Sequence, residues 1–386
     1  MNDIKNILPD FEPPLNKNRS YIPVCEPDLE GNELKYITDC VKSTWISSLG
    51  LYVNKFEKSF SSFCNVKFGI ACTSGTSALH LALAAIGLRP GEEVILPTFT
   101  MIATANAVTY AGATPVFIDA NPNTWNIDVD KIEEKINNKT RAIIVVHTYG
   151  YPADMDKVIA IAKKHRLFVI EDAAEAHGAE YKGKKVGSLG DIACFSFYGN
   201  KIITTGEGGM LLTNNEKIAR IVRILCDHGF SKKRHFWHQY IGFNYRMTNL
   251  QAAIGLAQVE RVDKFIKNRI EHAQLYKFFL EKIKGIILPP DTRDRKNVFW
   301  MYSILISDDF KINRNQLRIQ LASEGIETRT FFIPMHLQPV YYKKYYLGKF
   351  PVSEDLCRKG VCLPSGAMLK KNHIKLIASL IKNIST

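Results

Sequence analysis

Short apolar runs alternate with segments of helical periodicity along the first half of the chain. The runs have the length and the β-branched or aromatic content of buried strands, and glycine, proline or polar residues bound them. We expect strands at 68–72, 94–97, 115–119, 142–147, 167–170 and 192–197. Apolar residues at helical spacing predict helices at 33–42, 53–64, 78–86, 100–111, 129–136 and 155–165. This alternation predicts an α/β fold with a mainly parallel sheet and helices on both of its faces.

Two of the predicted helices have a clear apolar face. The helix at 33–42 places three apolar residues on one side: Leu34, Ile37 and Val41. The helix at 53–64 repeats phenylalanine at helical spacing: Phe56, Phe60 and Phe63. We expect the phenylalanines to lie in the core, because a helix buries the face on which its apolar residues recur.

The pattern changes in the second half of the chain. A strand at 210–212 and a helix at 218–225 precede an irregular basic and aromatic segment, 227–245, and a mostly helical region, 248–279. The remainder predicts a smaller α+β unit, with strands at 301–306 and 327–333 and helices at 314–324 and 371–384. We therefore divide the chain into a polar, proline-bearing arm, a large domain and a small C-terminal domain: 1–30, 31–255 and 256–386.

Composition and charge narrow the class of protein. The chain has 386 residues, 46% of them hydrophobic, and this is enough for a full core. Its formal charge of +13 is spread along the sequence, which favours a solvated surface or anionic small molecules over nucleic acid. Eight cysteines without metal-ligand spacing indicate a reduced, cytoplasmic setting and no metal site. The uncharged stretch 94–118 contains prolines and many threonines, so it does not predict a membrane span.

Candidate chemistry is concentrated around one lysine. Lys201 lies on a predicted turn between two apolar runs, and burial there would lower the pKa of its amine and make it a usable nucleophile. Asp172 stands at the carboxyl end of the strand 167–170, the edge of an α/β sheet at which ligands bind. Pyridoxal 5′-phosphate (PLP) needs such a pair, because a lysine bonds its aldehyde and a carboxylate keeps its ring nitrogen protonated. An ordinary surface turn with a solvated lysine is the alternative interpretation.

A loop of small residues supplies a second signal. The sequence 73–77, Thr-Ser-Gly-Thr-Ser, leads into the predicted helix at 78–86. A helix N-terminus with free backbone N–H groups binds phosphate, although the same residues would also serve as an ordinary N-cap. The chain contains neither GxGxxG nor GxxxxGK[ST], which argues against dehydrogenases and kinases.

Two motifs carry a family resemblance. EDAAEAHG at 171–178 and FSFYGNKIITTGEGGM at 195–210 resemble the signature of the PLP-dependent sugar-nucleotide aminotransferases of fold type I. The resemblance extends from about Tyr21 to the last predicted helix. It implies PLP as the cofactor, with Lys201 and Asp172 as catalytic residues. It also implies that the cofactor phosphate contacts Gly75, Thr76 and Ser196.

The resemblance implies three further cofactor contacts. Met101 stands where the family often has an aromatic ring that stacks on the cofactor, so methionine here departs from the family pattern. The nearby aromatic residue Phe99 is expected to lie in the core. Glu175 stands where the family often has glutamine, near the phenolic oxygen of the cofactor. Asn244 corresponds to a residue that reaches the cofactor phosphate of the neighbouring subunit, which implies a homodimer with shared active sites.

Substrate contacts stay open in the sequence. The resemblance places the turn 45–50 near the sugar nucleotide, but Trp45 could equally fill the core while the serines cap the next helix. Residues 232–235 could meet a diphosphate or form a solvated loop. They are Lys232, Lys233, Arg234 and His235. His336 lies in a stretch that the family places at the rim of the site, and we expect a structural histidine there.

The resemblance implies an aminotransferase that moves an amino group from L-glutamate to C4 of a nucleotide-linked 4-keto-6-deoxyhexose. A sugar dehydratase on the same scaffold is an alternative, although in the family that activity accompanies histidine at the position of Lys201. A protein that binds PLP without turnover, and a nucleotide-binding protein without PLP, are further alternatives. The residues do not distinguish GDP from UDP or dTDP.

Overall fold

The computed structural model describes residues 7–9, 12–16, 18–230, 234, 236–345 and 347–385. Within these residues, seven strands form a central sheet with the order β1-β9-β8-β5-β4-β2-β3. In that order their bounds are Phe68–Cys72, Gly209–Thr213, Ile192–Ser196, Phe168–Asp172, Thr140–Val146, Glu93–Pro97 and Thr114–Ile118. Strand β9 runs antiparallel to both of its neighbours, whereas the pairs from β8 to β3 are parallel. The predicted fold class, a mainly parallel α/β sheet flanked by helices, is confirmed.

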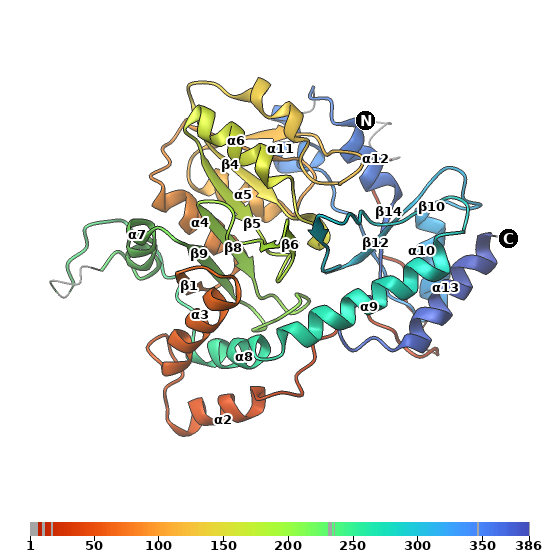
Figure 1. Ribbon diagram of the computed structural model, residues 1–386, viewed down its shortest axis with the longest axis horizontal. Helices are drawn as coiled ribbons and strands as arrows, with labels where there is room; N and C mark the ends of the chain where they lie inside the picture. The colour runs from red at the N-terminus through yellow and green to blue at the C-terminus, as the bar shows by residue number, and fades with distance from the viewer. Residues whose placement is uncertain are drawn as a thin grey trace.

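Helices cover both faces of this sheet, as Figure 1 shows. Neighbouring strand residues point to opposite faces, so that Leu96 packs with one group of helices and Ile95 with another. One face is covered by α4 (Gly75–Ala85), α5 (Ile102–Tyr110) and α7 (Glu216–Cys226). The other face is covered by α3 (Leu51–Phe63), α6 (Met155–His165) and α8 (Asn249–Val259).

A second sheet forms the C-terminal part of the molecule. Its strands among the described residues are β10 (Ile286–Ile287), β12 (Tyr302–Ile306), β14 (Gly360–Leu363) and β13 (Arg329–Thr330), paired antiparallel in this order. The long helix α9 (Val262–Leu280) packs on this sheet together with α10 (Arg314–Ser323) and α13 (Lys371–Ser385). Figure 1 shows α9 running from the central sheet to the C-terminal part. The break between α8 and α9 lies at residues 260–261, whereas residue 256, at which we place the domain change, lies within α8. The division into domains stays a prediction.

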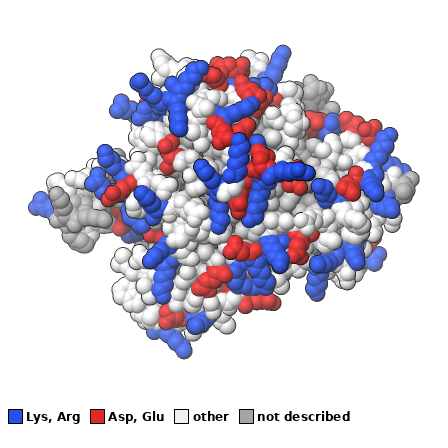
Figure 2. Space-filling model, in the orientation of Figure 1, with Lys and Arg blue, Asp and Glu red and all other residues white. Residues whose placement is uncertain are grey.

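Smaller elements complete the described chain. They are α2 (Glu33–Lys42), α11 (Pro339–Tyr345), α12 (Pro351–Lys359), β6 (Glu180–Tyr181), β7 (Lys184–Lys185) and β11 (Arg295–Lys296). The last three pair as a small antiparallel sheet. None of the helices formed by the described residues combines the length and the apolar composition that a bilayer span requires. Figure 2 shows basic and acidic side chains interspersed over the face that it draws, in keeping with the scattered charge of the sequence.

The predicted helix at 129–136 is wrong. Two 3₁₀ turns, Val129–Lys131 and Glu133–Lys135, occupy this segment. Its buried apolar anchors are Val129 and Ile132, three positions apart. Three residues per turn is the period of a 3₁₀-helix, so this spacing lets both anchors face the core without a longer α-helix.

The predicted strand at 327–333 shortens to a ladder of two residues, Arg329–Thr330. The chain leaves the ladder at Phe331, whose ring enters the core. Pro334 soon follows and cannot donate a ladder hydrogen bond.

The segment from α2 to α3 packs differently from what the pattern of apolar residues predicts. Phe56 and Phe60 lie in the core and Phe63 packs against it, as predicted. Helix α2 also forms as predicted, but Leu34 is 77% exposed and Val41 is 58% exposed. Trp45 is 56% exposed, so the interpretation that it fills the core is wrong. The serines do not cap α3, because Gly50 is the N-cap residue and the side chain of Asn249 accepts the N–H of Tyr52 instead.

Phe60 offers a test of the core beneath the sheet. Its ring is fully buried and meets Phe195 and Phe197 edge-on, with centroids 4.9 and 5.1 Å away. We expect Phe60→Ala to lower the free energy of unfolding by about 3–5 kcal/mol, because the lost ring leaves a cavity. Phe278→Ala, at a position 71% exposed, is the matched control and should change stability by less than about 0.5 kcal/mol. Equal losses of unfolding free energy in the two variants, measured by urea unfolding, would contradict this assignment of the core.

Candidate active site

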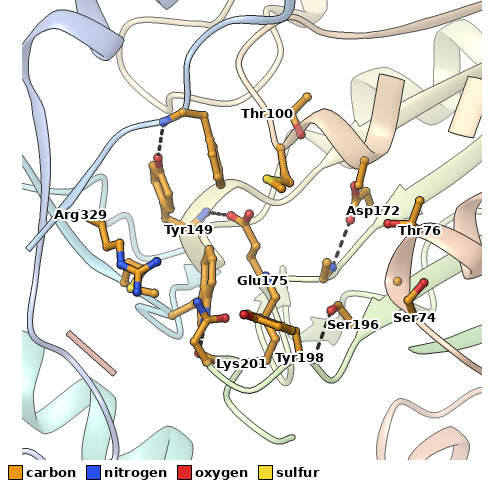
Figure 3. Close-up of a pocket in the computed structure, with 18 of the residues that line it drawn as sticks. Ser74, Thr76, Thr100, Tyr149, Asp172, Glu175, Ser196, Tyr198, Lys201 and Arg329 are labelled. Atoms are coloured by element: carbon orange, nitrogen blue, oxygen red, sulfur yellow. Dashed lines mark hydrogen bonds between the residues drawn. The ribbon is translucent and has the colours of Figure 1, made fainter. Parts of the chain in front are cut away.

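A cavity of about 410 Å³ lies at the carboxyl end of β5, between the central sheet and the C-terminal part. Its walls come from distant parts of the sequence. The central-sheet side contributes the start of α4, the end of β5 and the turn after β8, and the C-terminal side contributes residues near β12 and β13. Seven of the predicted site residues line it: Gly75, Thr76, Met101, Asp172, Glu175, Ser196 and Lys201. Figure 3 shows several of these side chains around the cavity.

Lys201 lies on the connection between β8 and β9. The connection is closed by backbone hydrogen bonds from Phe197 N to Gly208 O at 2.8 Å and from Lys201 N to Tyr198 O at 2.9 Å. The Nζ atom of Lys201 lies 3.6 Å from the ring centroid of Trp300. Burial lowers the pKa of this amine, and the nearby carboxylates of Glu175 and Asp172 oppose the shift. A lowered pKa raises the fraction of neutral amine, the form that attacks a carbonyl carbon.

Asp172 reaches the same cavity from the end of β5. Its Oδ2 accepts a hydrogen bond of 2.7 Å from the hydroxyl of Thr104, and its Oδ1 accepts one of 3.3 Å from the backbone N–H of Ala174. Burial raises the pKa of this carboxyl, and the hydrogen bonds from Thr104 and Ala174 oppose the shift. A buried carboxylate of this kind is stabilised by a positive charge beside it. A protonated pyridine nitrogen would supply that charge.

The start of α4 forms a cradle for an anion. Ser74 is the N-cap: its Oγ accepts the N–H of Ser77 at 3.1 Å and its carbonyl accepts the N–H of Ala78 at 3.0 Å. Of the first four N–H groups of the helix, those of Gly75 and Thr76 remain for a ligand. Both interpretations of this loop therefore hold, since Ser74 caps the helix while Gly75 and Thr76 line the cavity.

Close approach of the backbone explains two glycines at this cradle. A Cβ atom on Gly75 would lie 2.8 Å from the Cβ of Ser196. One on Gly209 would lie 2.2 Å from the carbonyl oxygen of Ser74. Glycine at both positions lets the end of β8, the start of β9 and the start of α4 meet. The free N–H groups, the buried carboxylate and the lysine together fit the phosphate, the ring nitrogen and the aldehyde of PLP.

Glu175, Met101 and Ser196 complete the predicted lining. The Oε2 of Glu175 accepts the backbone N–H of Tyr149 at 2.7 Å, and burial raises the pKa of this carboxyl to about 7. Met101 is 50% exposed and the Oγ of Ser196 accepts the N–H of Tyr198 at 3.3 Å. Phe99 is fully buried in the core, the place expected for it, and Met101 lines the cavity.

Asn244 and Arg234 do not line the cavity of their own chain. Asn244 is exposed, and its Oδ1 accepts a hydrogen bond of 3.2 Å from the Nε of Arg246. Lys232, Lys233 and His235 lie outside the described residues. Arg234 is exposed, with its guanidinium 5.3 Å from the ring centroid of Trp237.

His336 is built into the core. It is buried, its Nδ1 lies 2.8 Å from the hydroxyl of Thr98, and its Nε2 lies 3.2 Å from Glu354. Burial lowers the pKa of its ring to about 4. The residue does not line the cavity described above, which agrees with the expected structural histidine.

Tyr149, Trp300 and Arg329 are among the cavity residues that the sequence analysis did not identify. Tyr149 follows the carboxyl end of β4, so the rule that led to Asp172 would have found it. Trp300 and Arg329 come from the C-terminal part, and their place in the cavity depends on how that part packs against the central sheet. No spacing in the sequence signals such a contact.

This fold and this cavity define a class of enzyme, the PLP-dependent aminotransferases of fold type I. The chain belongs to the DegT/DnrJ/EryC1/StrS aminotransferase family, whose sequence model matches residues 27–382.

Particular relatives are similar over nearly their whole length. GDP-perosamine synthase of Escherichia coli O157:H7 is 47% identical over 94% of this chain and 98% of its own. GDP-perosamine synthase of Caulobacter vibrioides is 47% identical over 93% of this chain and 97% of its own. Among solved structures, Helicobacter pylori PseC, an aminotransferase involved in the biosynthesis of pseudoaminic acid, superposes with a TM-score of 0.90. It is 27% identical, and the match covers 95% of this chain and 99% of that one.

The raised pKa of Glu175 predicts a pH dependence of stability. The carboxyl group of Glu175 loses its proton near pH 4.5 in the unfolded chain, whereas in the folded chain it keeps this proton up to about pH 7. The protonated carboxyl therefore stabilises the fold fully at low pH, and this contribution is lost as the pH rises to about 7. We expect Glu175→Gln to flatten the fall of the unfolding free energy over this range, measured by urea unfolding of the cofactor-free protein. An unchanged slope would show that Glu175 is already ionised.

Proposed function

We propose that the protein transfers the amino group of L-glutamate to C4 of GDP-4-keto-6-deoxy-D-mannose and so forms GDP-perosamine. The observation that carries this proposal is the presence of Lys201, Asp172 and the open N-terminus of α4 around one cavity. The choice of sugar nucleotide is supported by the relatives named GDP-perosamine synthase, which match this chain almost from end to end.

The residues of this chain divide the chemical work. PLP, when bound, supplies a ring that accepts electrons from bonds at the amino-bearing carbon. Lys201 would hold the aldehyde of the cofactor, and its amine is placed to take a proton from the donor's Cα. Asp172 would keep the ring nitrogen protonated. Ser196 and the N–H groups of Gly75 and Thr76 would hold the phosphate.

The amino donor is an acid, and the cavity has a basic group to receive it. Arg329 lines the cavity, and its Nη2 pairs with Glu327 at 3.0 Å. A guanidinium binds carboxylates well because its N–H groups lie in one plane. Arg329 thus supports glutamate as the donor. Figure 3 shows this side chain on the same side of the cavity as Lys201 and Tyr149.

A homodimer with shared sites is the second part of the proposal. Large apolar side chains are exposed around α2 and the start of α3: Leu34, Val41, Trp45, Leu49 and Leu51. The segment after α7 exposes Phe236, Trp237 and Ile241. Exposed apolar surface of this kind marks contacts between proteins. In a dimer the exposed Asn244 would reach the cofactor phosphate of the partner.

A panel of nucleotide sugars tests the reaction. The purified protein, loaded with PLP and supplied with glutamate, should convert GDP-4-keto-6-deoxymannose at least about 10-fold more efficiently than its UDP and dTDP counterparts, a difference of about 1.4 kcal/mol in transition-state binding. Lys201→Ala should fold but lose turnover by several orders of magnitude, because the nucleophile and proton carrier is missing. Formation of 2-oxoglutarate and amino sugar is the measurement. Faster turnover of a UDP or dTDP sugar would contradict the GDP assignment, and an active Lys201→Ala would contradict the mechanism.

Mixing inactive variants tests the shared site. Lys201→Ala removes the amine of one site, and Asn244→Asp places a negative charge beside the partner's phosphate. A mixed dimer would contain one site with both defects and one site with neither. We therefore expect activity to reappear after the two variants are dissociated and re-associated together, with about a quarter of the wild-type rate for random pairing. Activity that stays absent while mixed dimers form would exclude the contribution of Asn244 across the interface.

A further inference from the structure

One side chain of the C-terminal part makes two contacts with the lysine turn. The ring of Trp300 lies under the amine of Lys201, with Nζ 3.6 Å from the ring centroid. The Nε1–H of the same indole donates a hydrogen bond of 2.8 Å to the carbonyl of Asn200, the residue before the lysine. The indole therefore contacts the backbone next to Lys201 and also the amine at the end of the lysine side chain.

The indole is itself held firmly. Trp300 is buried, and its carbonyl accepts a hydrogen bond of 2.8 Å from Nη1 of Arg269. The same nitrogen donates to the carbonyl of Ser365 at 2.9 Å, which ties Trp300 to the loop after β14. The ring also stacks with Tyr149 at a centroid distance of 6.3 Å. The backbone of Trp300 is thus held by groups outside the lysine turn.

We propose that Trp300 is a positioning residue that holds the amine of Lys201 whenever this amine is not bonded to the cofactor. This inference rests on the proposed function, in which one amine must leave the cofactor, carry a proton and return. The face of an indole attracts an ammonium group, and the attraction is strongest where water is excluded. The hydrogen bond to Asn200 fixes the turn, so the amine returns to the same place after each transfer.

Other charged groups act on the same amine. Asp172 and Glu175 face it from the end of β5, Cys25 approaches from the N-terminal arm, and burial opposes its charge. Arg329 and Glu207 line the same cavity. The indole differs from the carboxylates because it favours the ammonium without accepting its proton. It therefore holds the amine in place without competing for the proton that the reaction moves.

Fluorescence of the cofactor-free full chain tests the contact directly. The chain contains four tryptophans, so the signal of Trp300 is the difference between wild type and Trp300→Phe. We expect this difference to titrate with pH as the ammonium loses its proton. The same difference measured on a Lys201→Met background should be flat. A titration that persists without Lys201, or none with it, would overturn the contact.

The donor half-reaction of the holoenzyme, followed with glutamate alone, tests the positioning. Trp300→Leu should slow it about 10–100-fold, whereas Trp300→Phe keeps an aromatic face, loses the N–H and should slow it about 2–10-fold. The pH at which the rate rises should fall by about 0.5–1.5 units in Trp300→Leu, because the ammonium loses its stabilising partner. The affinity for glutamate should stay within about 2-fold, since the indole holds the lysine and not the donor.

Two controls separate positioning from general damage. Trp125→Phe alters a buried tryptophan outside the cavity and should leave the rate and its pH profile unchanged. Cys25→Ala removes another donor to the carbonyl of Asn200, at 3.2 Å, and should shift the pH profile less than Trp300→Leu does, because the ring contact with the amine remains. An equal loss of the half-reaction rate in Trp300→Phe and Trp300→Leu, without a shift of the pH profile, would overturn the proposal. A wild-type enzyme that fails with every nucleotide sugar would refute the proposed function while the fluorescence result still stands.

Discussion

The removal of one lysine amine from water is the constraint on which this site depends. An isolated ammonium group in a buried cavity is unfavourable, and here neighbouring groups neutralise or share its charge. Asp172 and Glu175 supply negative charge, and Trp300 supplies an aromatic face. The two carboxyl groups come from the end of β5, and the indole comes from the C-terminal part. The central sheet and the C-terminal part must therefore pack correctly before the amine is stable where it lies.

The register of the central sheet explains why these groups meet. Asp172 on β5 pairs with Cys194 on β8, and Ser196 farther along β8 pairs with Gly209 on β9. Gly209 in turn pairs with Cys72 at the end of β1, just before the cradle at the start of α4. The acid, the turn and the phosphate cradle thus lie at one edge of the sheet. A slip of one residue in any of these pairings would turn the side chains to the wrong face.

Much of this arrangement could be predicted from local signals. Apolar runs in the sequence predict the buried strands. The rule that ligands bind at the carboxyl ends of the strands then identifies Asp172 from the sequence alone. Local pattern could not predict the packing between distant parts, which placed Trp300 and Arg329 in the cavity. It also misled at α2, where Leu34 has the spacing of a core residue but no core to enter in a single chain. The spacing of apolar residues indicates one face of a helix, but it does not show whether that face is buried.

The reversed direction of β9 has a consequence for how the site can move. Because β8 and β9 are antiparallel, the chain leaves the ligand-binding edge of the sheet and returns to it without a crossover helix. The lysine is therefore carried on a connection whose two ends are both locked into the sheet, one of them between β1 and β8. Such a connection is tethered at both ends, so the backbone that carries the lysine has little freedom to move relative to the sheet.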